Sequence, residues 1–173
     1  MARLTFDGFP RTGNSWLSQC LVQAFPADEV AWGAHRAATL RYENNVIATL
    51  RAPQPAVASY MLFFGHGEPD ALLDWYCRFT TAIITYRERV FVAPFAVLTE
   101  QPQDTMRRYA DRFGLGEPVP FTFEQVAKSL RVTHAGNLPR PVTRERSEAE
   151  DAVAASPELP RALGIYEQAL SSI

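Results

Sequence analysis

The sequence predicts an α/β protein in which a central parallel β-sheet is flanked by helices. Short apolar runs of strand length alternate with longer stretches whose apolar residues recur every three or four positions. One run, Val46–Leu50, is almost continuously apolar, which is typical of a strand buried on both faces of a parallel sheet. The chain has 173 residues, 47% of them hydrophobic and 21% charged, and residues 1–173 are expected to form one domain with a sizeable core.

The first half of the chain contains three predicted strands. Residues 4–6 form the first strand, which runs into a turn-rich stretch at 8–15. Apolar residues then recur at helical spacing over 16–24 until a proline interrupts the pattern. The second strand is expected at 30–34 and the third at Val46–Leu50. This order predicts a strand, a glycine loop and a helix at the beginning of the domain.

The second half is predicted to be mainly helical. Proline opens and glycine closes several of its periodic stretches, as at helix starts and ends. Helices are expected from Pro53 to Gly65, from Pro69 to about Glu88, around 106–113, at 123–130 and at 160–170, with a fourth strand at 91–98. Between Glu124 and Glu145 there is no acidic residue, and this basic stretch is expected to be an irregular loop.

Composition excludes several classes of protein. With 17 basic and 19 acidic residues the net charge is −2, which gives no reason to expect a nucleic-acid partner. No apolar run approaches the roughly 18 residues of a membrane-spanning helix, and the first residues lack the apolar core of a signal peptide. We therefore expect no membrane span and a cytoplasmic location. Cys20 and Cys77, too few for a zinc cluster or a disulfide framework, are expected to be buried thiols.

The loop after the first strand has the spacing of a phosphate-binding loop. Gly8 and Gly13 form a G-x-x-x-x-G pattern, and Asn14 and Ser15 stand where an NTP-hydrolysing P-loop has Lys followed by Ser or Thr. A loop of this kind directs backbone N–H groups into one concavity, and the following helix adds the positive end of its dipole. The alternative is an ordinary turn between a strand and a helix.

Two segments together resemble the sulfotransferase family. Residues 10–17, Pro-Arg-Thr-Gly-Asn-Ser-Trp-Leu, resemble the family's 5′-phosphosulfate loop. Residues 46–60 resemble its 3′-phosphate motif, a strand that ends in Arg51 and is followed eight positions later by Ser59 on a helix. A third likeness joins residues 95–100 to the later Arg-Phe-Gly-Leu at 112–115, so that the resemblance covers most of residues 5–116.

The resemblance implies a compact version of the P-loop NTPase-like sulfotransferase fold. It implies 3′-phosphoadenosine 5′-phosphosulfate (PAPS) as donor, adenosine 3′,5′-bisphosphate (PAP) as product, and no metal. The sulfuryl group would pass to a hydroxyl or amine of a small-molecule or glycan acceptor. Because the chain is shorter than most members, an acceptor bound between two copies of a homo-oligomer and a loss of activity are both open.

The resemblance also assigns roles to individual residues. Arg11 would contact the transferring sulfuryl group, and His35, after the second strand, would take the proton of the acceptor, a role that suits a neutral imidazole. The donor would be held by ten residues: Arg11, Thr12, Gly13, Asn14, Ser15, Trp16, Arg51, Ser59, Arg131 and Arg140. The alternatives are a surface arginine at 11, a structural histidine at 35, with His66 and His134 as other candidate bases, and a core tryptophan at 16.

Physical arguments favour this donor over ATP. A bisphosphate presents two separated anions and needs two anion sites at the carboxyl edge of a sheet, which a phosphate loop and a strand-end arginine supply. A P-loop kinase or NTPase needs a loop lysine and a strand-end acid for Mg²⁺, for which Glu100 is the candidate. A non-catalytic nucleotide-binding protein is the other alternative. Aromatic residues of the middle helices (Tyr60, Phe63, Phe64, Trp75, Tyr76 and Phe79) could line an acceptor pocket or belong to the core.

Overall fold

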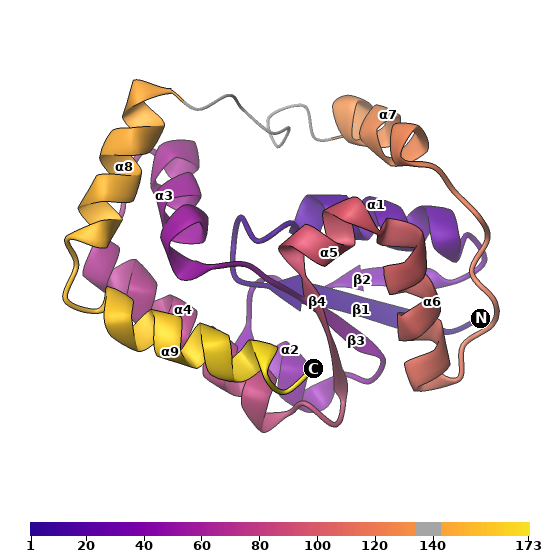
Figure 1. Ribbon diagram of the computed structural model, residues 1–173. Helices are drawn as coiled ribbons and strands as arrows, with labels where there is room; N and C mark the ends of the chain where they lie inside the picture. Colours follow the sequence, from indigo (N-terminus) through magenta and orange to yellow (C-terminus); the bar gives the residue numbers. More distant parts are fainter. Residues whose placement is uncertain (134–142) are drawn as a thin grey trace.

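The computed structural model describes residues 1–133 and 143–173, and it is built around a four-stranded parallel sheet with helices on both faces (Figure 1). The strands are β1 (Arg3–Gly8), β2 (Glu29–Trp32), β3 (Val46–Leu50) and β4 (Val90–Pro94), in the spatial order β2-β1-β3-β4. Every neighbouring pair is parallel. The predicted class, α/β with a central parallel sheet flanked by helices, is confirmed.

The helices of the described residues begin and end where local chemistry favours it. They are α1 (Asn14–Ala24), α2 (Ala37–Tyr42), α3 (Pro53–Phe64), α4 (Pro69–Thr85), α5 (Phe95–Glu100), α6 (Pro102–Phe113), α7 (Phe123–Thr133), α8 (Arg144–Ala154) and α9 (Leu159–Leu170). Four of them, α3, α4, α6 and α9, have proline in the first two positions, where no intrahelical bond needs its missing N–H. Gly65 and Gly114 end α3 and α6 in the left-handed conformation, which glycine adopts without steric cost.

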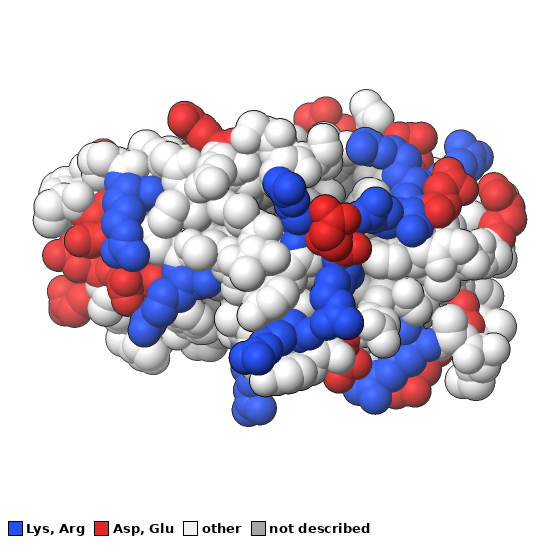
Figure 2. Space-filling view, turned by 90° about the horizontal axis from the view of Figure 1, so that it is seen from below, with Lys and Arg blue, Asp and Glu red and all other residues white. Residues whose placement is uncertain are grey.

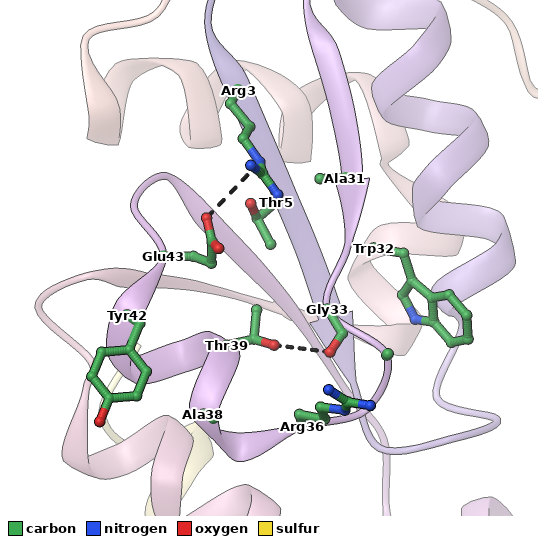
Figure 3. Close-up of a pocket in the computed structure, with 11 residues that line it drawn as sticks. Arg3, Thr5, Ala31, Trp32, Gly33, Arg36, Ala38, Thr39, Tyr42 and Glu43 are labelled. Atoms are coloured by element: carbon green, nitrogen blue, oxygen red, sulfur yellow. Dashed lines mark hydrogen bonds and ion pairs between the residues drawn. The ribbon is translucent and has the colours of Figure 1, made fainter.

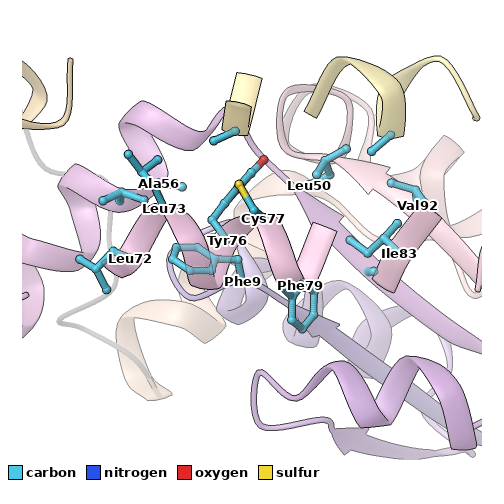
Figure 4. Close-up of a cluster of buried hydrophobic side chains, with 14 of the residues drawn as sticks. Phe9, Leu50, Ala56, Leu72, Leu73, Tyr76, Cys77, Phe79, Ile83 and Val92 are labelled. Atoms are coloured by element: carbon cyan, nitrogen blue, oxygen red, sulfur yellow. The ribbon is translucent and has the colours of Figure 1, made fainter. Parts of the chain in front are cut away.

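The sheet separates two apolar cores. Successive side chains of β3 point to opposite faces, and all five residues of the strand are buried. Val46, Ala48 and Leu50 join the core formed with α3, α4, α8 and α9, whereas Ile47 joins the core formed with α1, α6 and α7. Figure 4 shows the first core, in which Phe9 from the loop after β1 lies beside Tyr76 of α4. The loop is therefore anchored in the same core that fixes α4.

The fourth strand is shorter than predicted. The prediction of a strand over 91–98 is wrong beyond Pro94, where α5 begins. Proline cannot donate a hydrogen bond to a neighbouring strand, and its restricted backbone suits the residue before a helix. The Thr99 hydroxyl also donates to the carbonyl oxygen of Phe95 (2.9 Å), a contact that only the helical turn brings within reach.

Several other boundaries also differ from the prediction. The second strand ends at Trp32 rather than 34, because Ala34 and His35 take left-handed backbone angles (φ 57° and 58°). Helix α4 ends at Thr85, and α7 continues to Thr133 into the stretch predicted as an irregular loop. The part of that stretch at 134–142, which includes His134 and Arg140, lies outside the described residues.

Besides α5, two further helices were not predicted. Helix α2 has six residues, too few for a periodic pattern to stand out, and α8 carries charge on most of its surface. Helix α8 contacts α3 through a short apolar stripe that includes the buried Ala149 and Val153. Packing against α3 therefore stabilises a helix whose sequence alone reads as a charged, solvated segment.

The surface and the thiols agree with several expectations from composition. Figure 2 shows, on the face seen from below, basic side chains interspersed with acidic ones rather than gathered into one broad patch. Arg161 of α9, for example, pairs with Asp74 of α4 at 3.3 Å. Cys20 and Cys77 are fully buried free thiols, as predicted. Among the helices described, none combines the length and the apolar character needed to cross a bilayer.

Candidate functional site

The loop between β1 and α1 is anchored from beneath by two buried side chains. Phe9 is almost fully buried, with its ring centroid 5.1 Å from that of Trp75 and 5.3 Å from that of Tyr76. The Thr12 hydroxyl, also buried, donates to the carbonyl oxygen of Phe9 (2.6 Å). The loop therefore keeps a single shape above the carboxyl end of β1 at the start of α1.

Two of the predicted phosphate-binding side chains hold this loop rather than face outward. The Asn14 amide donates to the carbonyl oxygens of Gly8 (3.3 Å) and Phe9 (3.1 Å), and its oxygen accepts from the Thr49 hydroxyl (2.9 Å). The hydroxyls of Thr12 and Thr49 lie 2.6 Å apart. Asn14 can therefore serve an anion through its backbone N–H, since the first N–H groups of a helix have no intrahelical acceptor, whereas the N–H of Thr12 donates to the carbonyl oxygen of Phe9 (3.3 Å).

Gly13 is required where the loop enters α1. Its φ is 107°, and a β-carbon placed on it would lie 2.7 Å from the ring of Phe95. The Ser15 hydroxyl follows on the first turn of α1, and both residues lie at the positive end of the helix dipole. The glycine thus permits the tight turn that the predicted phosphate loop needs.

The structure brings together Arg11, Arg51 and Ser59, which the sequence predicted as donor-binding residues in two separate motifs. The Arg11 Nε donates to the Ser59 hydroxyl at 3.3 Å, and an Arg51 Nη1 donates to the carbonyl oxygen of Arg11 at 3.1 Å. The three residues belong to the β1–α1 loop, the end of β3 and helix α3. They meet at the carboxyl edge of the sheet, where open α/β sheets bind ligands.

Aromatic rings hold both guanidinium groups in place. The centre of the Arg11 guanidinium lies 4.3 Å from the ring centroid of Phe63, and that of Arg51 lies 4.7 Å from the ring centroid of Phe95. The Tyr76 hydroxyl also donates to the carbonyl oxygen of Arg51 (2.7 Å). These contacts restrict the side chains without neutralising their charge.

Helix α8 adds a third arginine that the sequence analysis did not assign. Burial lowers the pKa of Arg51, and the positive charges of Arg146 and then Arg11 lower it further, while Glu150 opposes them. Arg146 pairs with Glu150 at 3.0 Å within α8. Three positive charges therefore face one negative charge, which leaves an excess of positive charge for an anionic ligand. The i, i+4 spacing of Arg146 and Glu150 was visible, but their position depends on α8 packing against α3.

The structure describes one of the two late arginines that the sequence predicted. Arg131 is exposed on α7, the helix that packs against α1. Arg140 lies outside the described residues. Arg146 is the late arginine that the described structure sets beside Arg51.

His35 lies on the turn after β2, beside the start of the β1–α1 loop. Its Nδ1 is 2.6 Å from the carbonyl oxygen of Gly8, and its ring packs edge-on against Trp32 with centroids 5.2 Å apart. Its backbone N–H donates to the buried carboxylate of Asp7 (3.0 Å). Burial lowers the pKa of His35 below its ordinary value, so the imidazole is neutral at neutral pH. Asp7 was missed, although an acid within an apolar strand was a visible signal.

The other candidates have mainly structural surroundings. The Trp16 ring contacts Phe123 of α7, with centroids 4.8 Å apart, which favours the core alternative for this residue. His66 follows α3, with its ring centroid 6.3 Å from that of Phe64. Of the predicted aromatic set, Tyr76 and Phe79 are core residues, whereas Phe63 and Phe64 are exposed near Arg11.

Glu100 does not occupy the position of a metal-binding acid. It is the last residue of α5 and is exposed, not at the end of a strand. Within residues 1–133 and 143–173, no three His, Cys, Asp or Glu side chains gather closely enough to hold a metal ion.

Comparison with known proteins adds no family to this picture. No family model matches the chain, and no curated protein matches it significantly. The chemistry of the site is therefore argued from its residues.

Proposed function

We propose that this protein is a compact sulfotransferase that binds PAPS at the carboxyl edge of the sheet and transfers its sulfuryl group to a hydroxyl or amine. The observation that carries the proposal is the meeting of Arg11 with Ser59 and of Arg51 with Arg11, which joins the two predicted phosphate motifs in one place. The P-loop-like fold of that family is part of this proposal.

The two halves of the cluster suit the two anionic groups of the donor. The β1–α1 loop and the N-terminus of α1 offer N–H groups for the 5′ end, with the Arg11 guanidinium beside them. Arg51 and Ser59 offer charged and hydroxyl donors for the 3′-phosphate, and Arg146 adds charge. No residue of this set requires a metal ion to hold the ligand.

The proposed reaction is an in-line transfer. The acceptor oxygen or nitrogen forms a bond to sulfur, the bond between sulfur and the bridging phosphate oxygen breaks, and PAP leaves. The proton of the acceptor passes to Nε2 of His35 and then to solvent. Arg11 stays protonated, so it stabilises the charge that develops on the sulfuryl group and the leaving phosphate but supplies no proton.

A P-loop kinase or NTPase fits the site less well. The loop has no lysine, β3 ends in Arg51 rather than an acid, and Glu100 lies on a helix. These three differences act against a Mg²⁺-bound triphosphate.

Calorimetric titration tests the proposal directly. We expect PAP to bind with micromolar affinity in the absence of metal and ATP with Mg²⁺ to bind more weakly. Arg51→Ala should weaken PAP binding at least about tenfold, since a charged hydrogen bond to phosphate is lost. The affinity of Arg51→Lys for PAP should lie between those of the wild type and Arg51→Ala. Arg108→Ala, an exposed arginine on α6, is the matched control and should bind like the wild type.

The outcomes separate the alternatives. Preference for Mg-ATP, or no binding of either nucleotide, would refute the donor assignment. Turnover is then measured with radiolabelled PAPS and a panel of phenols, alcohols, amines and sugars. Tight PAP binding without transfer to any member of the panel would support a non-catalytic nucleotide-binding protein instead.

A further inference from the structure

Asp7 is a buried acid that the proposed reaction does not yet use. It lies in β1 between Phe6 and Gly8, and its side chain is fully buried. Charged residues are almost never fully buried unless they are paired or hydrogen-bonded. Its partners therefore show what it does in this fold.

The carboxylate of Asp7 ties together the two segments that form the candidate site. Its Oδ1 accepts from the backbone N–H of Gly8 (2.8 Å), where the phosphate loop begins, and from that of His35 (3.0 Å). Its Oδ2 accepts from the backbone N–H of Arg36 (3.3 Å). One side chain thus holds the loop after β1 and the turn after β2 in a fixed relation.

The turn after β2 is built around this carboxylate. A β-carbon on Gly33 would lie 2.2 Å from Oδ2, so only glycine leaves room for the acid. Figure 3 shows Gly33 and Arg36 on the turn, with the Thr39 hydroxyl of α2 donating to the Gly33 carbonyl oxygen. Ala34 and His35 then adopt successive left-handed angles, a conformation that costs free energy and persists only where other contacts impose it.

The same contacts decide which nitrogen of His35 accepts a proton. Nδ1 faces the carbonyl oxygen of Gly8 at 2.6 Å, and because a carbonyl can only accept, Nδ1 carries the hydrogen. In the neutral ring Nε2 is then the basic nitrogen. The Asp7 Oδ1 lies 3.8 Å from Nδ1, too far for a hydrogen bond but close enough for a strong charge interaction in a buried place.

We propose that Asp7 is the positioning residue of this site: it holds His35 with Nε2 as the proton acceptor and stabilises the imidazolium that forms during transfer. The last clause rests on the proposed sulfotransferase activity, whereas the positioning does not. Among the described residues, His35 is the titratable side chain that faces the carboxylate. Arg36 and Gly8 contact the carboxylate through their backbone N–H groups, and Gly8 lies in β1 next to Asp7. Gly33 packs against the carboxylate and carries no charge.

The ionisation of both groups agrees with this role. Burial raises the pKa of Asp7 to about 6, although backbone hydrogen bonds from Gly8, His35 and Arg36 act in the opposite direction. Burial lowers the pKa of His35. At neutral pH the carboxylate is charged and the imidazole neutral, which is the combination that a base needs. Because Oδ1 of Asp7 lies 3.8 Å from Nδ1 of His35, the proposed role requires that the protonation of one group affect that of the other.

Nuclear magnetic resonance of ¹⁵N-labelled histidine tests the positioning without any ligand. We expect the wild type to show the Nδ1–H tautomer of His35. In Asp7→Asn the pKa of His35 should fall further, because the nearby negative charge is gone. Glu43→Gln, which removes a charge paired with Arg3 at the end of α2, is the control and should leave the His35 titration unchanged.

Two results would overturn the inference: an Nε2–H tautomer in the wild type, or a His35 titration that Asp7→Asn leaves unaltered. If Asp7→Asn does not fold, the ¹³Cγ resonance of Asp7 in the wild type serves instead. A shared inflection in the Asp7 and His35 resonances supports the coupling, and independent titrations refute it.

Binding and turnover then separate this inference from the proposed function. Asp7→Asn should bind PAP within about threefold of the wild type, whereas its rate of sulfuryl transfer should fall about 10- to 100-fold. The variant should also lose the decrease in transfer rate that protonation of Asp7 causes in the wild type as the pH falls below about 6. Failure of the wild type to bind PAP would refute the sulfotransferase proposal but would not affect the conclusions drawn from the tautomer and titration of His35. Sulfuryl transfer at the wild-type rate in Asp7→Asn would refute only the proposed role of the Asp7 carboxylate.

Discussion

The burial of Asp7 predicts a specific dependence of stability on pH. The perturbation is a pH change from 3.5 to 8, applied to the wild type and to Asp7→Asn. Folding raises the pKa of the carboxyl from 3.8 to about 6, and a shift of about two units corresponds to about 3 kcal/mol at 1.4 kcal/mol per unit. Below the unfolded pKa both states are protonated and this stabilising contribution is fully present. It is lost as the pH rises through about 6, because the folded state must then bury a charge.

The variant removes the contribution of the carboxylate, and the further fall expected in the pKa of His35 acts in the same direction. His35 acts in the opposite direction, since its lowered pKa makes the folded state less stable as the pH falls, and this offsets part of the Asp7 effect in the wild type. Asparagine is uncharged at every pH and approximates the protonated acid in size. The difference in free energy of unfolding between Asp7→Asn and the wild type should therefore shift by about 3 kcal/mol in favour of the variant as the pH rises from 3.5 to 8.

Urea denaturation followed by circular dichroism at each pH measures both free energies. A difference between the two proteins that stays constant across this range would refute the reasoning, as would a variant that loses stability relative to the wild type as the pH rises. Glu43→Gln, measured in parallel, controls for the loss of one negative charge.

Three further changes test the geometry of the site. Gly13→Ala should destabilise the fold by about 2 kcal/mol or more, because φ is 107° and the new methyl would meet an aromatic ring; wild-type stability in urea would contradict this. Ala34→Gly should stabilise the fold by about 1 kcal/mol, because glycine adopts the left-handed angle without strain. Ala38→Gly within α2 should destabilise the fold by about 1 kcal/mol, so melting temperatures that shift in the same direction in both variants would contradict the prediction. Tyr76→Phe should cost about 1 kcal/mol and weaken PAP binding, since the Arg51 carbonyl loses its donor; unchanged calorimetry would argue against that contact.

Several elements could be predicted because their signals are local. The strand Val46–Leu50 has the predicted bounds, since five successive residues suited to burial have no competing helical pattern. Helix α3 begins at Pro53 and ends before Gly65, where the chemistry of the terminal residues decides the boundaries. The approach of Arg51 and Ser59 to Arg11 also followed from motif spacing, because parallel strands end at one edge of the sheet.

The misses have one common physical reason: the deciding contact was distant in sequence. Residues 95–98 have a strand-like composition, but after Pro94 they form α5, whose Phe95 packs against Gly13 and Arg51. Helix α8 has a charged sequence and is held by α3. Local propensity is weak enough for such packing to override it.

For this protein, the sequence by itself determined the α/β class, the succession of strands and most helices along the chain, and the expectation that the glycine loop and a strand-end arginine lie at one edge of the sheet. Hydrophobic period, proline and glycine act over a few residues, so one sequence displays them. Only the tertiary structure decided that Arg146 joins Arg51, that Asn14 serves the loop, and that Asp7 lies against His35. These depend on side chains from separate segments meeting in a buried place, where charge and hydrogen bonding take the values that chemistry uses.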